Sequence, residues 1–478
     1  MVKNIQAIVL AAGKSTRFKT GNTKLLEKIC GQEMILYAIK LLKQLNIPTT
    51  MIVGYKKDVI QPVVAQYTNN TVSFIEQLEQ KGTGHALLCS KPIWTEDHIL
   101  VMNGDMPLIT ETIVQELYAK HIKTQAAISF VTSHITDPVN NSYGRVIKSE
   151  NSIQIVEQKD FEGDPLEHCC INAGIYLINK QFLVEHILSL DQNNKSNEFY
   201  LTDLIKIASD KQYTVTTYTA PFDCIRGVNT LQELWAVEQI KRAELIKHWM
   251  EQGVHFPTAQ STHVDLDVTI GAGTFIGCGV HVSSGSVIGE NCIIRAFSSI
   301  ENSTIHDNTI IESHTIVKNS IIGKHAHIGP FAHVHTNSVI QDYATIGNFV
   351  EVKNSTIGTE TNAKHLAYLG DACIGNEVNI GAGTITCNYD GIQKHQTIIE
   401  DNAFIGSNNT LVAPLTIKHG AFTAAGSTIT KDVPEDALAI ARERQTNKEK
   451  YALKIREKKQ SNRFSFLGAI KTHHDITT

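Results

Sequence analysis

Branched apolar residues return at every sixth position through the second half of the 478-residue chain, from about residue 262. The series runs from Ile270 to Ile300, slips by one residue at Ile305 and again at Ile322, and continues to Ile417. Six steps of about 100° leave successive residues about 240° apart around a helix, so the period is not a helical stripe. Frequent glycines exclude one long strand. The repeat therefore predicts a parallel β-helix, a solenoid of hexapeptides whose apolar residues stack inside each coil.

Up to about residue 230, short apolar runs alternate with longer amphipathic segments. "AIVLAA", "TTMIVG" and "HILVMNGD" are such runs, and "MILYAIKLLKQL" is one of the amphipathic segments. The alternation predicts an α/β domain with a mostly parallel sheet. Ligands bind at the carboxyl ends of strands in such sheets, and polar clusters follow the strands after Leu10 and around Asp105.

Two further segments complete the organisation. Thr230 to Val254 has apolar residues at helical spacing and few helix breakers, which predicts one long connecting helix. After Asp436 the repeats stop, and we expect the charged, polar end to be solvated and partly disordered. The expected organisation is an α/β domain over 1–229, a linker helix over 230–254, a β-helix domain over 255–440 and a tail over 441–478.

Composition excludes several classes of protein. The net charge of −5 gives no basic field, which argues against nucleic acid as the main partner. Nine cysteines form no CxxC pair and no framework of even spacings, so neither a metal cluster nor a disulfide scaffold is expected. The sequence has no signal-peptide pattern and no run of about 18 apolar residues. We therefore expect a cytoplasmic protein that does not bind membranes.

The stretch "AIVLAAGKSTRF", Ala7 to Phe18, contains the Gly-Lys-Ser of a phosphate loop. That loop needs a second glycine five residues earlier, so that its backbone N–H groups wrap the phosphates, and this position holds Ile8. An ATP-hydrolysing loop is therefore excluded. What remains is a strand end followed by Gly13, which permits close backbone approach, and by Arg17 and Lys24, which can neutralise a triphosphate.

Several motifs occur together. They are "LAAG" at 10–13 with a downstream Thr-Arg and lysine, "GTGHA" at 82–86, "NGDMPL" at 103–108, and the hexapeptide half. Over about residues 5–446 the chain resembles the bacterial bifunctional family of N-acetylglucosamine-1-phosphate uridyltransferases and glucosamine-1-phosphate acetyltransferases. The resemblance implies a Rossmann-like sugar nucleotidyltransferase domain followed by a left-handed β-helix acetyltransferase domain. It also implies a homotrimer with active sites between subunits.

The activity that the resemblance implies has two steps. The β-helix domain acetylates glucosamine-1-phosphate with acetyl-CoA. The N-terminal domain then transfers UMP from UTP to N-acetylglucosamine-1-phosphate and releases pyrophosphate. The product, UDP-N-acetylglucosamine, feeds peptidoglycan and lipopolysaccharide synthesis.

At the first site, Asp105 ends the run "ILVMNGD" and puts a carboxylate at the carboxyl edge of a strand. The alternative is a turn aspartate that caps the next helix. Metal-coupled phosphoryl transfer needs hard oxygen ligands, of which magnesium takes one or two from the protein. The resemblance pairs Asp105 with Asn229 of "GVN" as magnesium ligands, and it implies a nucleotide- and sugar-binding set. The set is Leu10, Ala11, Ala12, Gly13, Lys24, Asn103, Gly104, Asp105 and Asn229, with Gln77, Gly82 and Thr83 at the uracil and Gly144, Glu157 and Asn172 at the N-acetylglucosamine.

The second site is expected where the repeats are interrupted, since a regular coil offers little beyond stacked aliphatic residues. His365 lies in the first interruption, and an imidazole with a pKa near neutrality suits a general base that deprotonates an amine. The resemblance assigns this role to His365 and makes Tyr389 a candidate donor to the oxyanion. It implies the sugar-phosphate ligands His335, Lys353, Tyr368, Asn379 and Lys394, and the acetyl-CoA or oxyanion ligands Ala382, Asn388, Tyr389, Ser407, Ala425 and Arg442.

Two residues depart from the family pattern. Ser15 stands where the family usually has glycine, so we expect a different backbone approach there. His335, in "FAHVHT", stands where the family's "FARLRP" has a phosphate-binding arginine. An imidazole is only partly charged near pH 7 and cannot make the same bidentate contact, which predicts weaker or more pH-dependent binding of glucosamine-1-phosphate.

Two other functions remain open. One is a single-activity sugar-phosphate nucleotidyltransferase whose β-helix only trimerises or regulates it. His365, Asn388 and Tyr389 argue against it, because a scaffold has no need of them. The other is a non-catalytic repeat-based binding protein, which the pairing of Asp105 and Asn229 with Lys24 disfavours.

Overall fold

The structure is a computed structural model that describes residues 2–19, 21–136, 142–150 and 152–460. It divides into two compact units, Met1–Tyr343 and Ala344–Thr478. In the predicted tail, residues 451–460 form a helix whose residues are all exposed, and the disorder expected further on falls on residues 461–478, which lie outside the described residues.

The first unit contains a nine-stranded sheet whose main path is β11-β7-β10-β6-β1-β4-β5. Its central strands are parallel, as predicted, because β1 pairs in parallel with both β4 and β6. The exceptions are β10, which is antiparallel to β6 and β7, and the hairpin β8–β9 beside it. The strands are β1 (Ile5–Ala11), β4 (Thr49–Val53), β5 (Ser73–Glu76), β6 (His98–Asn103), β7 (Ile128–His134), β8 (Arg145–Lys148), β9 (Ile153–Val156), β10 (Cys170–Asn179) and β11 (Val215–Thr219), and a separate pair is β2 (Lys28–Ile29) and β3 (Gln32–Glu33).

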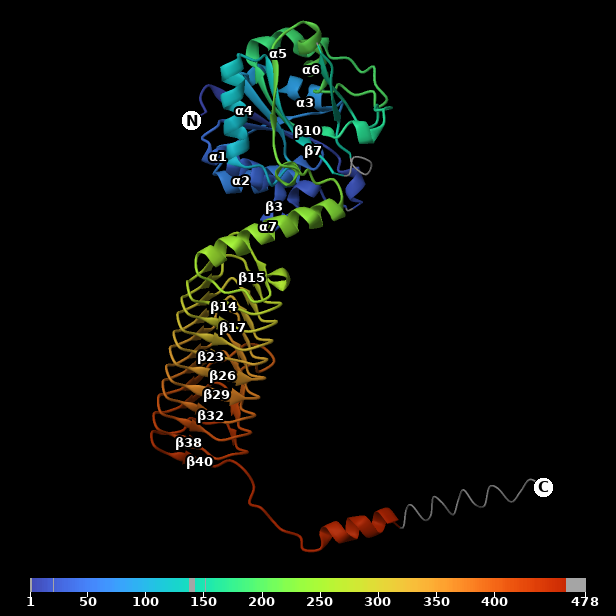
Figure 1. The fold of residues 1–478 in the computed structure, drawn as a ribbon. Coiled ribbons are helices and arrows are strands. Elements are labelled where there is room, and N and C mark those ends of the chain that lie inside the picture. The colour runs from blue at the N-terminus through green and yellow to red at the C-terminus, as the bar shows by residue number, and fades with distance from the viewer. Residues whose placement is uncertain (1, 20, 137–141, 151, 461–478) are drawn as a thin grey trace, which may run out of the picture. The chain divides into compact units, whose positions relative to one another are not determined.

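Helices alternate with these strands, and the last of them leads from the sheet to the first β-helix coils (Figure 1). The predicted connecting helix is α7, and the Thr230 hydroxyl caps it by accepting from the N–H of Glu233. The helices are α1 (Met34–Gln44), α2 (Lys57–Thr68), α3 (Thr83–Cys89), α4 (Glu111–Thr124), α5 (Lys180–His186), α6 (Asp203–Asp210) and α7 (Leu231–Glu251).

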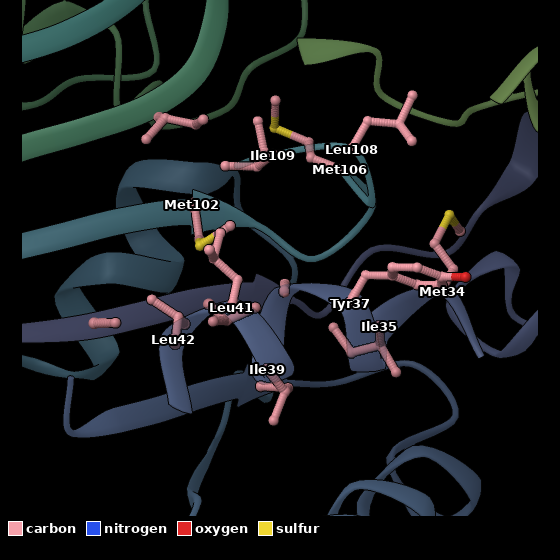
Figure 2. Close-up of a cluster of buried hydrophobic side chains, with 14 of the residues drawn as sticks. Met34, Ile35, Tyr37, Ile39, Leu41, Leu42, Met102, Met106, Leu108 and Ile109 are labelled. Carbon is pink, nitrogen blue, oxygen red and sulfur yellow. The ribbon is translucent and has the colours of Figure 1, made fainter. Parts of the chain in front are cut away.

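A core beneath the strand ends holds the loop that follows β6. Figure 2 shows Ile35 and Ile39 of α1 in the same apolar cluster as Met102 of β6 and Met106 of that loop. Each of the two isoleucines is almost fully buried, which stabilises the packing by about 1.5–3 kcal/mol per side chain. Gly104 approaches Ile35 so closely that a Cβ would lie 2.6 Å from its Cδ1. The packing therefore sets the position of the loop that carries Asp105.

The six-residue period forms a β-helix, with one short strand on each of three sides per coil (Figure 1). In the first unit the sides are β12 (His263–Val264), β15 (His281–Ser283), β18 (Ser299–Glu301), β21 (Ile316–Lys318) and β24 (His333–His335); β13 (Thr269–Ile270), β16 (Val287–Ile288), β19 (Thr304–Ile305), β22 (Ile321–Ile322) and β25 (Val339–Ile340); and β14 (Phe275–Ile276), β17 (Ile293–Ile294), β20 (Ile310–Ile311) and β23 (His327–Ile328). In the second unit they are β27 (Glu351–Lys353), β30 (Tyr368–Gly370), β33 (Ile385–Cys387), β36 (Thr410–Val412) and β39 (Thr428–Ile429); β28 (Thr356–Ile357), β31 (Ala372–Ile374), β34 (Thr397–Ile399) and β37 (Leu415–Ile417); and β26 (Thr345–Asn348), β29 (Asn362–His365), β32 (Asn379–Ile380), β35 (Phe404–Ile405), β38 (Phe422–Thr423) and β40 (Leu438–Ala439).

The two slips in the repeat have a simple structural cause. His281 pairs with Ser299, eighteen residues on, whereas Ser299 pairs with Ile316 and Ile316 with His333, each seventeen residues on. Two coils are therefore shorter by one residue. Ile305 and Ile322 nevertheless remain about as buried as the interior residues of adjacent coils. The missing residue comes from the turns between strands, so the strand pairing is kept.

His121 of α4 is a buried histidine whose titration should affect stability. It is 1% exposed, and its Nδ1 lies 2.7 Å from Ser129 Oγ and its Nε2 3.1 Å from His98 Nδ1. Burial, with a smaller contribution from His98, lowers the pKa of His121 to about 4. Below about pH 6.5 His121 is protonated in the unfolded chain but stays neutral in the folded chain. The free energy of unfolding therefore falls as the pH drops from 6.5 toward 4.

We expect a His121→Gln variant to lose about 2 kcal/mol less free energy of unfolding between pH 7 and pH 5 than the native chain does. Urea-induced unfolding of the full chain at both pH values measures the difference. His134→Gln, which replaces an exposed histidine of the same domain, is the control and should behave as the native chain. Equal pH dependence in all three proteins would contradict the expectation.

Candidate active sites

Two cavities meet at the carboxyl ends of the parallel strands in the first unit. One has a volume of about 650 Å³ and the other about 660 Å³. Arg17, Asp105 and Asn229 line both, so they lie at the boundary between the two. The first cavity is lined by the predicted nucleotide-binding residues Leu10, Ala11, Ala12, Gly13, Lys24, Gln77, Gly82, Thr83, Asn103, Asp105 and Asn229, and the second by the predicted sugar-binding residues Gly144, Glu157 and Asn172. Gly104 lines neither cavity, and its N–H donates to the Leu10 carbonyl at 3.0 Å.

A cationic centre lies at that boundary. The ammonium Nζ of Lys24 is 2.5 Å from Asp105 Oδ2 and 2.8 Å from Asn229 Oδ1. Arg17 Nη2 donates to the same Asn229 oxygen at 3.0 Å. Two oxygens from distant parts of the chain therefore converge on one positive charge, and the side chains of Lys24 and Asp105 are only 14% and 17% exposed. A carboxylate and an amide oxygen converging in this way form a donor set suited to a hard divalent cation.

Glu233, which the sequence did not single out, holds Asn229 in place. The Asn229 N–H donates to Glu233 Oε2 at 2.7 Å, and the same oxygen accepts from the Thr230 hydroxyl at 3.2 Å. Thr230 is the N-cap of α7, and its hydroxyl accepts from the Glu233 N–H, as the Thr-x-x-Glu spacing of the sequence predicts. Tyr143 holds the segment just before Asn229, because its hydroxyl accepts from the Gly227 N–H at 2.9 Å.

The second cavity presents buried polar groups at the predicted sugar site. Glu157 Oε1 accepts from the Thr202 hydroxyl at 2.9 Å, and burial raises the pKa of the Glu157 carboxyl. Asn172 donates its amide to Tyr176 Oη at 2.6 Å and its backbone N–H to the Gly144 carbonyl at 2.9 Å. The three predicted sugar-binding residues are thus fixed by hydrogen bonds and packing, as specific recognition of a polar ligand requires.

In the second unit, His365 ends β29 beside Asn348 of β26. The two residues are register partners, and His365 Nδ1 lies 2.9 Å from Asn348 Oδ1. An amide oxygen only accepts hydrogen bonds, so Nδ1 carries the hydrogen and the neutral imidazole keeps its lone pair on Nε2. His365 is exposed, so Nε2 is accessible to a substrate amine. The sequence did not indicate Asn348.

Several predicted sugar-phosphate ligands lie close together in this unit. Asn388 Nδ2 is 3.4 Å from the Tyr368 hydroxyl. Lys394 forms an ion pair at 3.7 Å with Asp371, whose backbone N–H donates to the Lys353 carbonyl at 3.0 Å. Asn379 pairs with Asn362, three residues before His365 on the same strand. The structure therefore brings the predicted sugar-phosphate ligands Lys353, Tyr368 and Lys394 close to Asn388, which was predicted as an acetyl-CoA or oxyanion ligand. Asp371, which contacts three of these four residues, was not predicted.

The predicted acetyl-CoA residues form a ladder along one edge of the coils. Ala382, Ser407 and Ala425 each follow the first residue of β32, β35 and β38 by three positions, and these strands pair in sequence. Arg442 follows β40, which pairs with β38. Tyr389 is 60% exposed, and its hydroxyl donates to the Gly391 carbonyl at 2.8 Å, a bond that must open before the hydroxyl can serve an oxyanion.

Similarity to known proteins extends along most of the chain. Residues 7–188 match a family model described as a MobA-like NTP transferase domain, and residues 247–352 match one described as an EIF2B subunit epsilon LbH domain. The "Bifunctional protein GlmU" of Thermosipho melanesiensis is 39% identical over 459 residues, covering 96% of this chain and 99% of that protein. The proteins of the same name from Thermodesulfovibrio yellowstonii and Clostridioides difficile are 41% and 40% identical, covering 93% and 95% of this chain and 98% and 99% of theirs.

The chain belongs to the GlmU family. The predicted family, the fold class of a nucleotidyltransferase domain followed by a left-handed β-helix, and the pair of transferase activities are confirmed. The single-activity alternative is not favoured. Among the described residues, none of the helices is long and apolar enough to span a membrane.

Ser15, the first departure from the GlmU pattern, has a left-handed backbone with φ of 54°. Left-handed backbone costs an ordinary L-residue roughly 1–2 kcal/mol, a penalty that glycine avoids. The glycine usual at this position is thus explained by backbone conformation. The Ser15 hydroxyl is buried without a hydrogen-bond partner in the part of the chain that the structure describes.

His335, the second departure, is at the end of β24, where its ring stacks on His333 at 4.1 Å and its Nδ1 lies 2.8 Å from Thr336 Oγ1. We expect His335→Arg to lower the KM for glucosamine-1-phosphate about tenfold, because a hydrogen bond to a charged group contributes about 1.5–3 kcal/mol. Acetyl-transfer kinetics over a range of glucosamine-1-phosphate concentrations measure this, and an unchanged KM would refute it.

Proposed function

We propose that this GlmU-family chain makes UDP-N-acetylglucosamine by acetylating glucosamine-1-phosphate in its second half and uridylating the product in its first. The observation that carries the proposal is the convergence of Lys24, Asp105 and Asn229 between two cavities. A nucleotide fits one side and a sugar phosphate the other, with the transferred phosphorus between them. The product supplies the cell with a precursor of peptidoglycan and lipopolysaccharide.

In the first site, an oxygen of the sugar phosphate attacks the α-phosphorus of UTP, and the bond to pyrophosphate breaks. Arg17 and Lys24 neutralise the phosphate oxygens on which charge accumulates. Asp105 and Asn229 would hold Mg²⁺, which supplies positive charge to the triphosphate when bound. Gln77, Gly82 and Thr83 hold the uracil, and Gly144, Glu157 and Asn172 hold the N-acetylglucosamine.

In the second site, the amine of glucosamine-1-phosphate attacks the thioester carbon of acetyl-CoA. His365 Nε2 takes the proton that the amine loses as the C–N bond forms. Collapse of the tetrahedral intermediate breaks the C–S bond and releases the thiol. Asn348 keeps the imidazole in the tautomer that can act as a base, while Lys353, Tyr368, Asn379 and Lys394 hold the sugar phosphate.

The proposed assembly is a homotrimer. Its support in this chain is the exposed apolar surface of the second unit, where Ile392 is 89% exposed and the stacked rings of Phe404 and Phe422 are 41% and 48% exposed. Burial of such side chains against a second copy of the chain would remove apolar area from water. Sedimentation equilibrium should give three times the chain mass of 52.8 kDa.

Separate assay of the two half-reactions tests the proposed activities. Purified protein with acetyl-CoA and glucosamine-1-phosphate, but no UTP, should release free thiol. Protein with UTP, N-acetylglucosamine-1-phosphate and Mg²⁺ should release pyrophosphate, and a chelator should stop only this reaction. Failure of either reaction with its full substrate set would refute the corresponding half of the proposal.

A further inference from the structure

Asp371 occupies the turn between β30 and β31 and is nearly buried, with its side chain 12% exposed. Its backbone is left-handed, with φ of 48°, and its N–H donates to the Lys353 carbonyl. This conformation directs the carboxylate at two neighbouring segments. One is the turn that carries Asn354, and the other is the inserted loop after β33, which carries Asn388 and Lys394.

Each oxygen of the carboxylate has an amide donor. Asp371 Oδ1 accepts from Asn354 Nδ2 and Oδ2 accepts from Asn388 Nδ2, both at 2.5 Å. Lys394 Nζ lies 3.7 Å from Oδ2. An ionised carboxylate can only accept hydrogen bonds, so the Asn388 amide must face it with nitrogen. The tyrosine hydroxyl of Tyr368, 3.4 Å away, meets the same nitrogen.

The orientation of the Asn388 amide has a chemical consequence. With its nitrogen toward Asp371, its carbonyl oxygen faces the opposite side of the side chain. Asn388 is 7% exposed as a whole residue, and within the described residues no group donates to this oxygen, so it is left for a hydrogen-bond donor of a ligand. An acceptor cannot stabilise an oxyanion, but it can accept an N–H from a substrate amine.

We propose that Asp371 is a positioning residue for acetyl transfer, which locks the Asn388 amide so that its oxygen accepts an N–H of the glucosamine amine. The proposal rests on the proposed acetyltransferase function. A bond to this oxygen turns the amine lone pair toward the thioester, and His365 removes the proton as the C–N bond forms. Asp371 itself touches no substrate atom.

The test compares acetyl-transfer kinetics of Asp371→Ala and Asp371→Asn with those of Asp401→Ala. Asp401 is a matched control, because it too bonds an asparagine of the preceding coil: Asn376 donates its backbone N–H at 2.6 Å and its side chain at 3.4 Å. We expect both Asp371 variants to lower kcat at least tenfold, since the Asn variant keeps the shape but lets the Asn388 amide invert. Asp401→Ala should keep native kinetics.

A double-mutant cycle separates positioning from general stabilisation. If Asp371 acts through Asn388, the double variant Asp371→Ala/Asn388→Ala should be no slower than Asn388→Ala alone. The rate of uridyl transfer by each variant should equal that of the native chain, which shows that the variant is folded. Three results would each overturn the proposal. They are a native kcat for acetyl transfer in Asp371→Asn, a loss of kcat in Asp401→Ala equal to that in Asp371→Ala, and losses of kcat that add in the double variant. Absence of acetyl transfer in the native chain would instead overturn the proposed function.

Discussion

Replacing His365 with alanine should lower kcat for acetyl transfer by about 10²–10⁴-fold and leave uridyl transfer unchanged. The amine must lose a proton as it attacks, and His365 Nε2 is the basic atom that the structure presents at this site. The hydrogen bond from Nδ1 to Asn348 holds the ring in the tautomer that leaves Nε2 free. Measuring thiol release and pyrophosphate release on one preparation gives both activities.

The control for this prediction is His419→Ala, which removes an exposed histidine of the same unit. It should leave both activities native. Retention of more than a tenth of native acetyl transfer by His365→Ala would exclude it as the base.

The parts of the fold that sequence predicted are those set by local periodicity. Most residues that face the interior of a β-helix coil are apolar, so the six-residue spacing predicted interior positions such as Ile276 and Ile294 from the sequence alone. The direction of a strand relative to its neighbours has no comparable pattern in the sequence. The run that forms β10 is mostly apolar, which indicates burial on both faces, but nothing in it indicates that the strand is antiparallel to β6.

The candidate sites divide in the same way. Asp105 could be predicted as a site residue because it follows a strand. His365 could be predicted because it lies where the hexapeptide repeat is interrupted. Asn348 and Asp371 could not be predicted from the sequence. Each hydrogen-bonds to a residue seventeen positions further along the chain, and which residues of neighbouring coils come together depends on the length of the coil. Glu233 lies between these cases. Its Thr-x-x-Glu spacing predicts a helix cap, but only the structure shows that the cap also holds Asn229.

An Asp105→Asn variant should lower kcat for uridyl transfer by about 10²–10³-fold, with acetyl transfer unchanged. The substitution keeps the size of the side chain and removes the charge on the oxygen that now contacts Lys24. Arg17 and Lys24 remain, so the KM for UTP should not rise in proportion. A loss confined to kcat indicates that Asp105 acts on the transferred phosphoryl group and not on nucleotide binding alone.

Asp97 provides the matched control, because it precedes β6 as Asp105 follows it. Its carboxylate accepts from Asn4 Nδ2 at 3.0 Å, at the opposite end of the strand from the cavities. Asp97→Asn should therefore keep both activities. The dependence of pyrophosphate release on Mg²⁺ concentration completes the argument: a metal ligand predicts that Asp105→Asn needs more Mg²⁺ for half-maximal rate, whereas a helix-capping aspartate predicts no shift. An unshifted Mg²⁺ dependence with native kcat would return Asp105 to the role of a turn residue.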